Sequence, residues 1–154
     1  MDAQNVDLSE IWPAIVAAGL TRDRRKKNYQ SADYRNDDSA AVGVAGEYVY
    51  ALFTDSKVDL SYKPEGDGGM DFPGVDVKTS TFPSDPHLKL FEKDFSKPAE
   101  RFVLVALCLQ KRQARLVGWI SKDDAKQVAT RRDYGYGNVF SIGWQDLQPM
   151  EALA

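Results

Sequence analysis

The sequence feature that most constrains the fold is the run RFVLVALCL, from Arg101 to Leu109, which is apolar almost without interruption. A strand with one solvent-exposed face would alternate apolar and polar residues, whereas this run does not. It is typical of a strand that is buried on both faces. We therefore expect an α/β fold in which this strand belongs to a mixed central β-sheet with helices on its faces.

Other hydrophobic patterns predict the elements around that strand. A length of 154 residues, 43% of them hydrophobic, suits a single domain with one core. Pro13 interrupts or restarts the first helix. The expected helices are Leu8–Leu20, Ala40–Phe53, Ser121–Ala129 and Trp144–Leu153, and the expected strands are Lys57–Lys63, Val75–Thr79, His87–Phe91, Arg115–Ile120 and Val139–Ile142.

The strand Val75–Thr79 carries an acid and an amine on one face. Side chains alternate along a strand, so both of its valines point to one face, and Asp76 and Lys78 point together to the other. An ammonium group at this place can orient an attacking water or stabilise charge that develops on a phosphate.

A second acid, Asp71, comes just before the turn formed by Phe72, Pro73 and Gly74. A tight hairpin or a bulge there would fold Asp71 back beside Asp76. Two carboxylates at that separation repel each other unless they share a proton or bind a cation. We favour the cation, and an all-oxygen site suits Mg²⁺ or Mn²⁺ better than zinc.

A third acid, Glu47, is the only charged residue in the segment Ala40–Phe53. A helix that is apolar nearly all round is a buried helix. A lone carboxylate in it is costly unless the group is protonated, paired or bound to a metal. Gly43 and Gly46 permit a close approach of this helix to the sheet.

These residues together resemble the PD-(D/E)xK, or restriction-endonuclease-like, nucleases. Asp71 matches the first acid of the family motif, Asp76-Val77-Lys78 matches the (D/E)xK tripeptide, and Glu47 matches a glutamate on the helix that precedes the sheet. Met70 stands where the family name has proline, and Asp76 stands where glutamate is commoner.

The resemblance implies a restriction-endonuclease-like fold and an enzyme that hydrolyses phosphodiester bonds in DNA with Mg²⁺ or Mn²⁺, as an endonuclease rather than an exonuclease. Small single-domain members of the family include phage and junction-resolving nucleases. The catalytic core would be 40–109, between an N-terminal helix and basic arm (1–39) and C-terminal strands and helices (110–154). The implied metal ligands are Glu47, Asp71, Asp76 and the Val77 carbonyl, with Lys78 as the fourth catalytic side chain.

The densest basic cluster lies in the expected N-terminal arm and includes Arg24, Arg25, Lys26 and Lys27. These side chains would contact DNA phosphates, with Tyr29 following them as a ring that can stack on bases. The alternative is a charged loop in contact with solvent only. Both interpretations stay open.

Composition limits the classes of function. The net charge of -3 argues against a broad basic surface, so DNA binding would need a local patch or a metal. One histidine, His87, and one cysteine, Cys108, cannot form a zinc cage, and we interpret His87 as a loop residue and Cys108 as core. No apolar run reaches the roughly 18 residues of a membrane span, and the N-terminus is acidic. We expect a soluble protein of the cytoplasm, in a bacterial or phage-infected cell, with no membrane partner, and we also consider a homodimer.

Two other functions compete with the nuclease. One is a catalytically silent DNA-binding or protein-interaction module on the same scaffold. The other is a metal-dependent hydrolase of a small phosphate ester or nucleotide. Four residues of catalytic type argue against the first, and the basic arm favours a polymeric substrate over the second.

Overall fold

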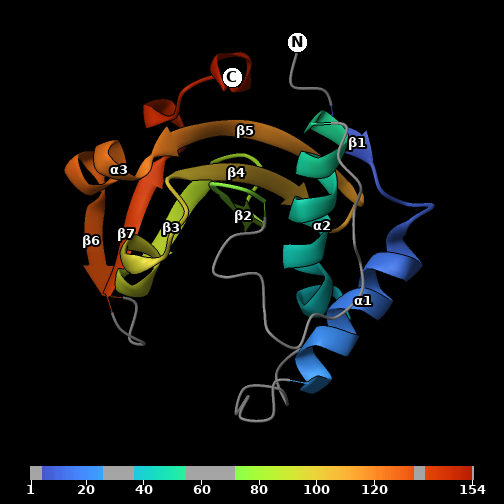
Figure 1. Cartoon of the computed structure of the whole chain (residues 1–154). Helices are drawn as coiled ribbons and strands as arrows, with labels where there is room; N and C mark the ends of the chain where they lie inside the picture. Colours follow the sequence, from blue (N-terminus) through green and yellow to red (C-terminus); the bar gives the residue numbers. More distant parts are fainter. Residues whose placement is uncertain (1–4, 26–36, 55–71, 134–137, 154) are drawn as a thin grey trace.

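The computed structural model describes residues 5–25, 37–54, 72–133 and 138–153, with the main chain only in 22–25 and 37–40. Within these residues the strands form a four-stranded sheet of order β1-β5-β4-β2 and a three-stranded sheet of order β3-β7-β6 (Figure 1). The elements are β1 (Val6–Asp7), α1 (Trp12–Arg25), α2 (Asp37–Thr54), β2 (Val75–Ser80), β3 (His87–Phe91), the 3₁₀ turn η2 (Glu92–Ser96), β4 (Arg101–Cys108), β5 (Gln113–Ser121), α3 (Lys122–Val128), β6 (Thr130–Asp133), β7 (Asn138–Gly143) and the 3₁₀ turns η3 (Trp144–Asp146) and η4 (Met150–Ala152).

Strand β4 lies inside the four-stranded sheet, between β2 and β5. It runs parallel to β2, with Val77 opposite Val103, and antiparallel to β5. The sheet is therefore mixed, as the sequence predicted. The expected Lys57–Lys63 strand lies outside the described residues.

The apolar run of β4 is buried on both faces, which confirms the first prediction from the sequence. Alternate side chains enter two different hydrophobic cores. The helix-side core contains Val103, Val105 and Leu107 together with residues of α1 and α2. The sheet-side core contains Phe102 and Leu104 together with residues of β3, β5, α3 and β7.

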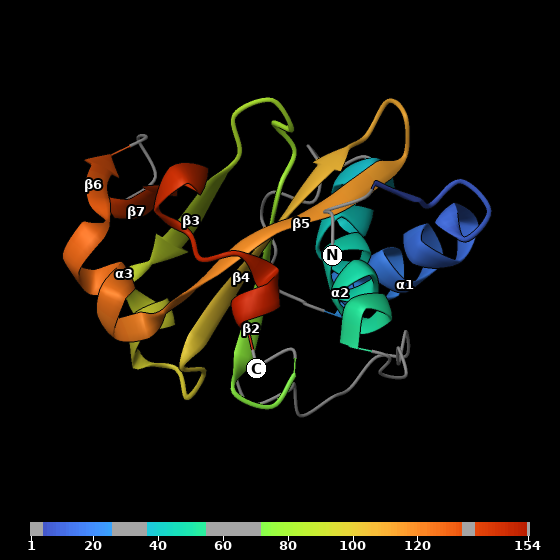
Figure 2. The same ribbon diagram turned by 90° about the horizontal axis from the view of Figure 1, so that it is seen from above.

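The layers around the four-stranded sheet differ from the expected arrangement. Helices α1 and α2 cover one face, and the three-stranded sheet with α3 lies against the other (Figures 1 and 2). Helices thus lie on both faces, as predicted, but on the second face α3 is accompanied by a three-stranded sheet that the sequence did not predict. The fold class itself, a single mixed α/β domain, is confirmed.

Helix α2 can lie close to the sheet because Gly46 has no side chain. A Cβ atom there would overlap the Thr79 hydroxyl and would lie 3.5 Å from a Val77 methyl group of β2. Half of the α2 residues from 41 to 54 are buried, but Leu52 is 50% exposed, so α2 is not enclosed on all sides. None of the helices in the described residues is long and apolar enough to cross a membrane.

Three elements differ from the sequence prediction in extent or type. Helix α1 begins at Trp12, so Pro13 lies in its first turn, where a missing N–H is tolerated, and it continues past Leu20 to Arg25. Strand β6, at Thr130–Asp133 directly after α3, is not among the strands that the sequence predicted. The expected C-terminal helix is wrong, because η3 and η4 are single 3₁₀ turns on either side of Pro149.

The segment after η3 crosses β5 instead of forming a helix. Trp119 and Gln148 exchange two main-chain hydrogen bonds of 3.0 and 2.7 Å, and the Trp119 indole N–H donates to the Pro149 carbonyl at 3.1 Å. Gly118 permits this crossing, since a Cβ atom there would overlap the Gln148 carbonyl oxygen. Pro149 disfavours a helix here, and the hydrogen bonds to Trp119 hold the segment against β5. The apolar spacing that predicted a C-terminal helix is therefore overridden.

Candidate active site

The turn at the start of β2 has the tight geometry that the sequence predicted. Phe72 and Val75 exchange two main-chain hydrogen bonds, of 3.1 and 2.9 Å. Gly74 has a φ of 73°, which glycine adopts without the steric cost of a side chain. Its carbonyl accepts from the N–H groups of Glu100 and Arg101 at 3.1 Å, so the turn is fixed to the start of β4. Asp71, directly before this turn, lies outside the described residues.

Asp76 and Lys78 share one face of β2, as expected from the alternation. The Lys78 ammonium lies 3.2 Å from Oδ2 of Asp76, and the residue Asp76 is only 6% exposed. The contact lacks hydrogen-bond geometry, so within the described residues Oδ2 is a buried acceptor without a hydrogen bond. Val77, whose carbonyl was an expected ligand, lies between them and packs its side chain in the helix-side core.

A second carboxylate, Asp94 in η2, completes the surroundings of Lys78. It is fully buried, and its Oδ1 lies 3.1 Å from the Lys78 ammonium and 3.3 Å from that of Lys97. Its Oδ2 accepts a hydrogen bond of 2.7 Å from the Phe91 main-chain N–H. The sequence analysis missed Asp94. The only local signal is an acid three residues after Phe91, a spacing that also occurs in solvated turns.

The pKa values of this cluster move in the directions that keep both partners charged. Burial by itself lowers the pKa of Lys78, but the Asp76 and Asp94 carboxylates together raise it above its ordinary value. Burial likewise favours a higher pKa for Asp94, but the Phe91 N–H and the ammonium groups of Lys78 and Lys97 hold it below the ordinary value. Lys78 is therefore a cation at neutral pH.

Glu47 lies on α2 and is half-buried, so the expected full burial of this carboxylate is wrong. Its helix packs on the face of β2 that carries Val75 and Val77, opposite to the face that carries Asp76 and Lys78. Among the described residues, no group of three histidine, cysteine, aspartate or glutamate side chains is arranged to hold a metal ion. Of the three carboxylates expected as ligands, the structure places Glu47 and Asp76 and does not describe Asp71.

The basic cluster is described only in part. Arg24 and Arg25 are the last two residues of α1, so this part of the basic cluster is helical. Lys26 and Lys27 lie outside the described residues. The DNA-contacting role of these four residues stays a prediction.

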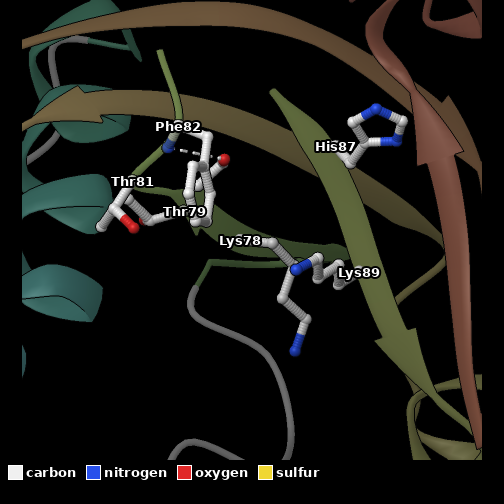
Figure 3. Close-up of a pocket in the computed structure, with 7 residues that line it drawn as sticks. Lys78, Thr79, Thr81, Phe82, His87 and Lys89 are labelled. Carbon is white, nitrogen blue, oxygen red and sulfur yellow. Dashed lines mark hydrogen bonds between the residues drawn. The ribbon is translucent and has the colours of Figure 1, made fainter. Parts of the chain in front are cut away.

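A pocket of about 170 Å³ opens beside Lys78 (Figure 3). It is lined by residues 78–82 together with His87 and Lys89. His87 is the first residue of β3, the strand expected at His87–Phe91, and it lines this pocket instead of lying in the preceding loop. Its Nδ1 lies 3.1 Å from the Ser141 hydroxyl, and its Nε2 lies 3.3 Å from Oδ2 of Asp85. The imidazole is therefore held at both nitrogens and forms a fixed wall of the pocket.

Comparison of the chain with family models, with curated proteins and with solved structures found no match. The resemblance to the PD-(D/E)xK nucleases thus depends on the motif residues alone. What the site can do follows from its described geometry, which is a buried carboxylate and a fixed ammonium on one strand, next to a small polar pocket.

Proposed function

We propose that the protein is a Mg²⁺- or Mn²⁺-dependent nuclease that hydrolyses phosphodiester bonds within DNA strands. The observation that carries the proposal is the Asp76–Lys78 pair, in which a buried carboxylate oxygen without a hydrogen bond lies 3.2 Å from an ammonium group. An acid and a lysine in this relation are what the D-x-K motif requires.

The donor chemistry at Asp76 suits a hard divalent cation. Oδ2 of Asp76 is paired with the Lys78 ammonium but accepts no hydrogen bond among the described residues, so it has acceptor capacity left for a bound cation. Asp76 would hold the ion with Asp71 and the Val77 carbonyl as further oxygen donors, whereas the helix that carries Glu47 packs on the opposite face of β2. When bound, the ion supplies Lewis-acid stabilisation of negative charge on the phosphate.

The role of Lys78 follows from its being protonated at neutral pH. Because its pKa is raised, Lys78 is not a general base at neutral pH and acts as a positioned cation. Asp94 fixes the ammonium at 3.1 Å, so the charge is already in place before a phosphate arrives. Positioned charge of this kind stabilises a transition state more than a ground state, because little reorganisation is needed during the reaction.

The test is cleavage of covalently closed circular DNA with Mg²⁺ or Mn²⁺ and with EDTA, alongside linear, branched and single-stranded DNA and RNA. A closed circle has no ends, so nicking identifies an endonuclease. Asp76→Asn and Lys78→Met should each reduce the rate at least about 100-fold. Asp123→Asn and Lys126→Met, matched changes at exposed positions of α3, should keep the parent rate. Parent-rate cleavage by Asp76→Asn would show that the site is elsewhere.

One observation favours a second function, a catalytically silent module that binds DNA or another protein. Asp76, Lys78, Asp94 and Lys97 form a charge-balanced network of two acids and two amines, which can serve stability alone. In that case DNA binds, but no metal supports cleavage, and the Lys78→Met variant loses stability only.

A further inference from the structure

An aromatic ring stands at the mouth of the pocket beside Lys78. Phe82 lies in the loop between β2 and β3 and is 66% exposed, the most exposed of the large hydrophobic residues in the described part of the chain. The ring lines the pocket with Lys78 and Lys89, which come from β2 and β3 (Figure 3). Exposure of a phenylalanine to water is unfavourable, so the position needs a physical reason.

The loop that carries Phe82 is held in place by three hydrogen bonds. The Phe82 N–H donates to the Ser80 hydroxyl at 3.2 Å, and the Phe82 carbonyl accepts from the Asp85 N–H at 3.3 Å. The next carbonyl, that of Pro83, accepts from the Arg115 guanidinium at 3.1 Å. A ring on an anchored loop loses little conformational entropy when a ligand covers it.

The interior of the pocket suits a small anion. Lys78 and Lys89 line it with two amines, of which Lys78 is also paired with Asp76 and Asp94, and Ser80 and Thr81 line it with residues that carry hydroxyl groups. The Lys89 ammonium lies 5.8 Å from the centre of the Phe82 ring, so cation and ring are adjacent. The volume of about 170 Å³ is smaller than the roughly 300 Å³ at which pockets for whole drug-sized ligands begin. One phosphate group fits such a space better than a complete nucleotide.

We propose that this pocket is a subsite for an unpaired DNA strand, in which a backbone phosphate enters between Lys78 and Lys89 and a neighbouring base stacks on Phe82. Bases inside a duplex already stack on both faces, so a ring fixed at a pocket mouth can cover only a base that is unstacked. The identity of the ligand as DNA rests on the proposed nuclease function. With this subsite, the protein would bind single-stranded or branched DNA in preference to continuous duplex.

The test is binding of a fluorescent oligothymidylate of about ten nucleotides in EDTA, followed by anisotropy, with a duplex of equal length beside it. Phe82→Ala should weaken single-strand binding about 5- to 150-fold, because that range corresponds to loss of one stacked base. Duplex binding should change less than about twofold. The matched control is Phe91→Ala, since Phe91 is 39% exposed and has the Lys93 ammonium 5.7 Å from its ring but does not line the pocket.

A second pair of measurements separates base from phosphate. On an oligomer of abasic sites, Phe82→Ala should bind like the parent, because no base remains to stack. Lys89→Gln should flatten the dependence of log Kd on log salt by about 0.7 for the single strand, the value for one phosphate contact. Equal loss on thymidylate and abasic strands, or no loss on either, would overturn the inference.

The binding and cleavage measurements test the subsite and the nuclease activity separately. If Phe82→Ala loses single-strand affinity while the parent cuts no DNA with any metal, the subsite stands and the nuclease does not. If the parent cuts DNA and Phe82→Ala binds and cuts single strands like the parent, the nuclease stands and the subsite is wrong.

Discussion

Asp94 shows how much the order of the candidate site depends on one residue. A fully buried carboxylate is tolerated only when it is paired and hydrogen-bonded, and Asp94 has two ammonium partners and one main-chain donor. It connects η2 to β2, two segments that are distant in sequence. The position of the Lys78 ammonium consequently depends on Asp94 of η2 as well as on β2.

Replacing Asp94 by asparagine should destabilise the protein by about 2–3 kcal/mol. The amide keeps the shape but leaves Lys78 and Lys97 without their shared negative partner in a buried place. Urea unfolding measures the change. Asp123→Asn, at an exposed site of α3, should change the free energy of unfolding by less than about 0.5 kcal/mol.

The same comparison has a defined pH dependence. The pKa of Asp94 is lowered by folding, so its contribution is present above its ordinary value of 3.8 and is lost as pH falls through the folded value. The pKa of Lys78 is raised by folding, so its contribution is present below 10.5 and is lost as pH rises through the folded value. The stability gap between parent and Asp94→Asn should therefore be widest at neutral pH and narrow at both extremes. A gap that grows on acidification would contradict the assignment.

At the scale of elements, the sequence predicted correctly the strands, turns and helices that are determined by a few neighbouring residues. The apolar run gave β4, alternation gave the shared face of Asp76 and Lys78, and Phe72-Pro73-Gly74 gave the turn. The helix expected from Ser121 begins there in the structure, where the Ser121 hydroxyl accepts from the Asp124 N–H at 3.1 Å. Each of these features is decided by a few neighbouring residues. The segment after Trp144 is decided by bonds to β5, so its helical pattern misled the prediction.

The two glycines of α2 should respond in opposite directions to alanine. Gly46→Ala places a methyl group against the Thr79 and Val77 side chains, and the forced shift of α2 from β2 should cost about 1–3 kcal/mol. Gly43→Ala meets no atom within 4 Å, so the better helix propensity of alanine should stabilise the protein by up to about 1 kcal/mol. Thermal unfolding of the two variants checks the pair. Stabilisation of equal size at both positions would show that helix propensity and not contact with β2 decides the outcome.

At the scale of the whole molecule, β4 joins two cores that would otherwise be separate. Val103 faces the helix-side core and Leu104 the sheet-side core, and both are fully buried. The sequence indicated that β4 has a layer on each face, because its apolar run does not alternate. It did not indicate what each layer is, since helices and a second sheet can both cover apolar side chains.

Because of this shared strand, damage to one core should unfold the other. Leu104→Ala should cost about 2–5 kcal/mol, and the midpoints by far-UV circular dichroism and by tryptophan fluorescence should fall together. Trp12 lies in the helix-side core and Trp119 packs against it, so fluorescence reports on the side opposite to Leu104 once the exposed Trp144 is replaced by phenylalanine in parent and variants alike. Val128→Ala, at a residue that is 43% exposed, is the control. Two separated midpoints would mean that the cores unfold independently.

The sequence predicted only those parts of the candidate site that are formed by residues close together in the chain. Asp76 and Lys78 are two residues apart, so their common face follows from the geometry of a strand. Asp94 is brought to Lys78 by the path of the chain through β3 and η2, and no local pattern contains that information. The same holds for the pocket, where Phe82 and Lys89 meet across a turn between strands.

The position of β4 in the chain has a consequence for synthesis on the ribosome. Both α1 and α2 leave the exit tunnel before β4, a strand against which they pack, has been translated. Their apolar faces have no native partner during that interval, a condition in which nascent chains associate with one another or with chaperones. A pause in translation before Arg101 would prolong this exposure. A pause that comes later, when β4 and β5 are already outside the tunnel, would allow the helix-side core to form.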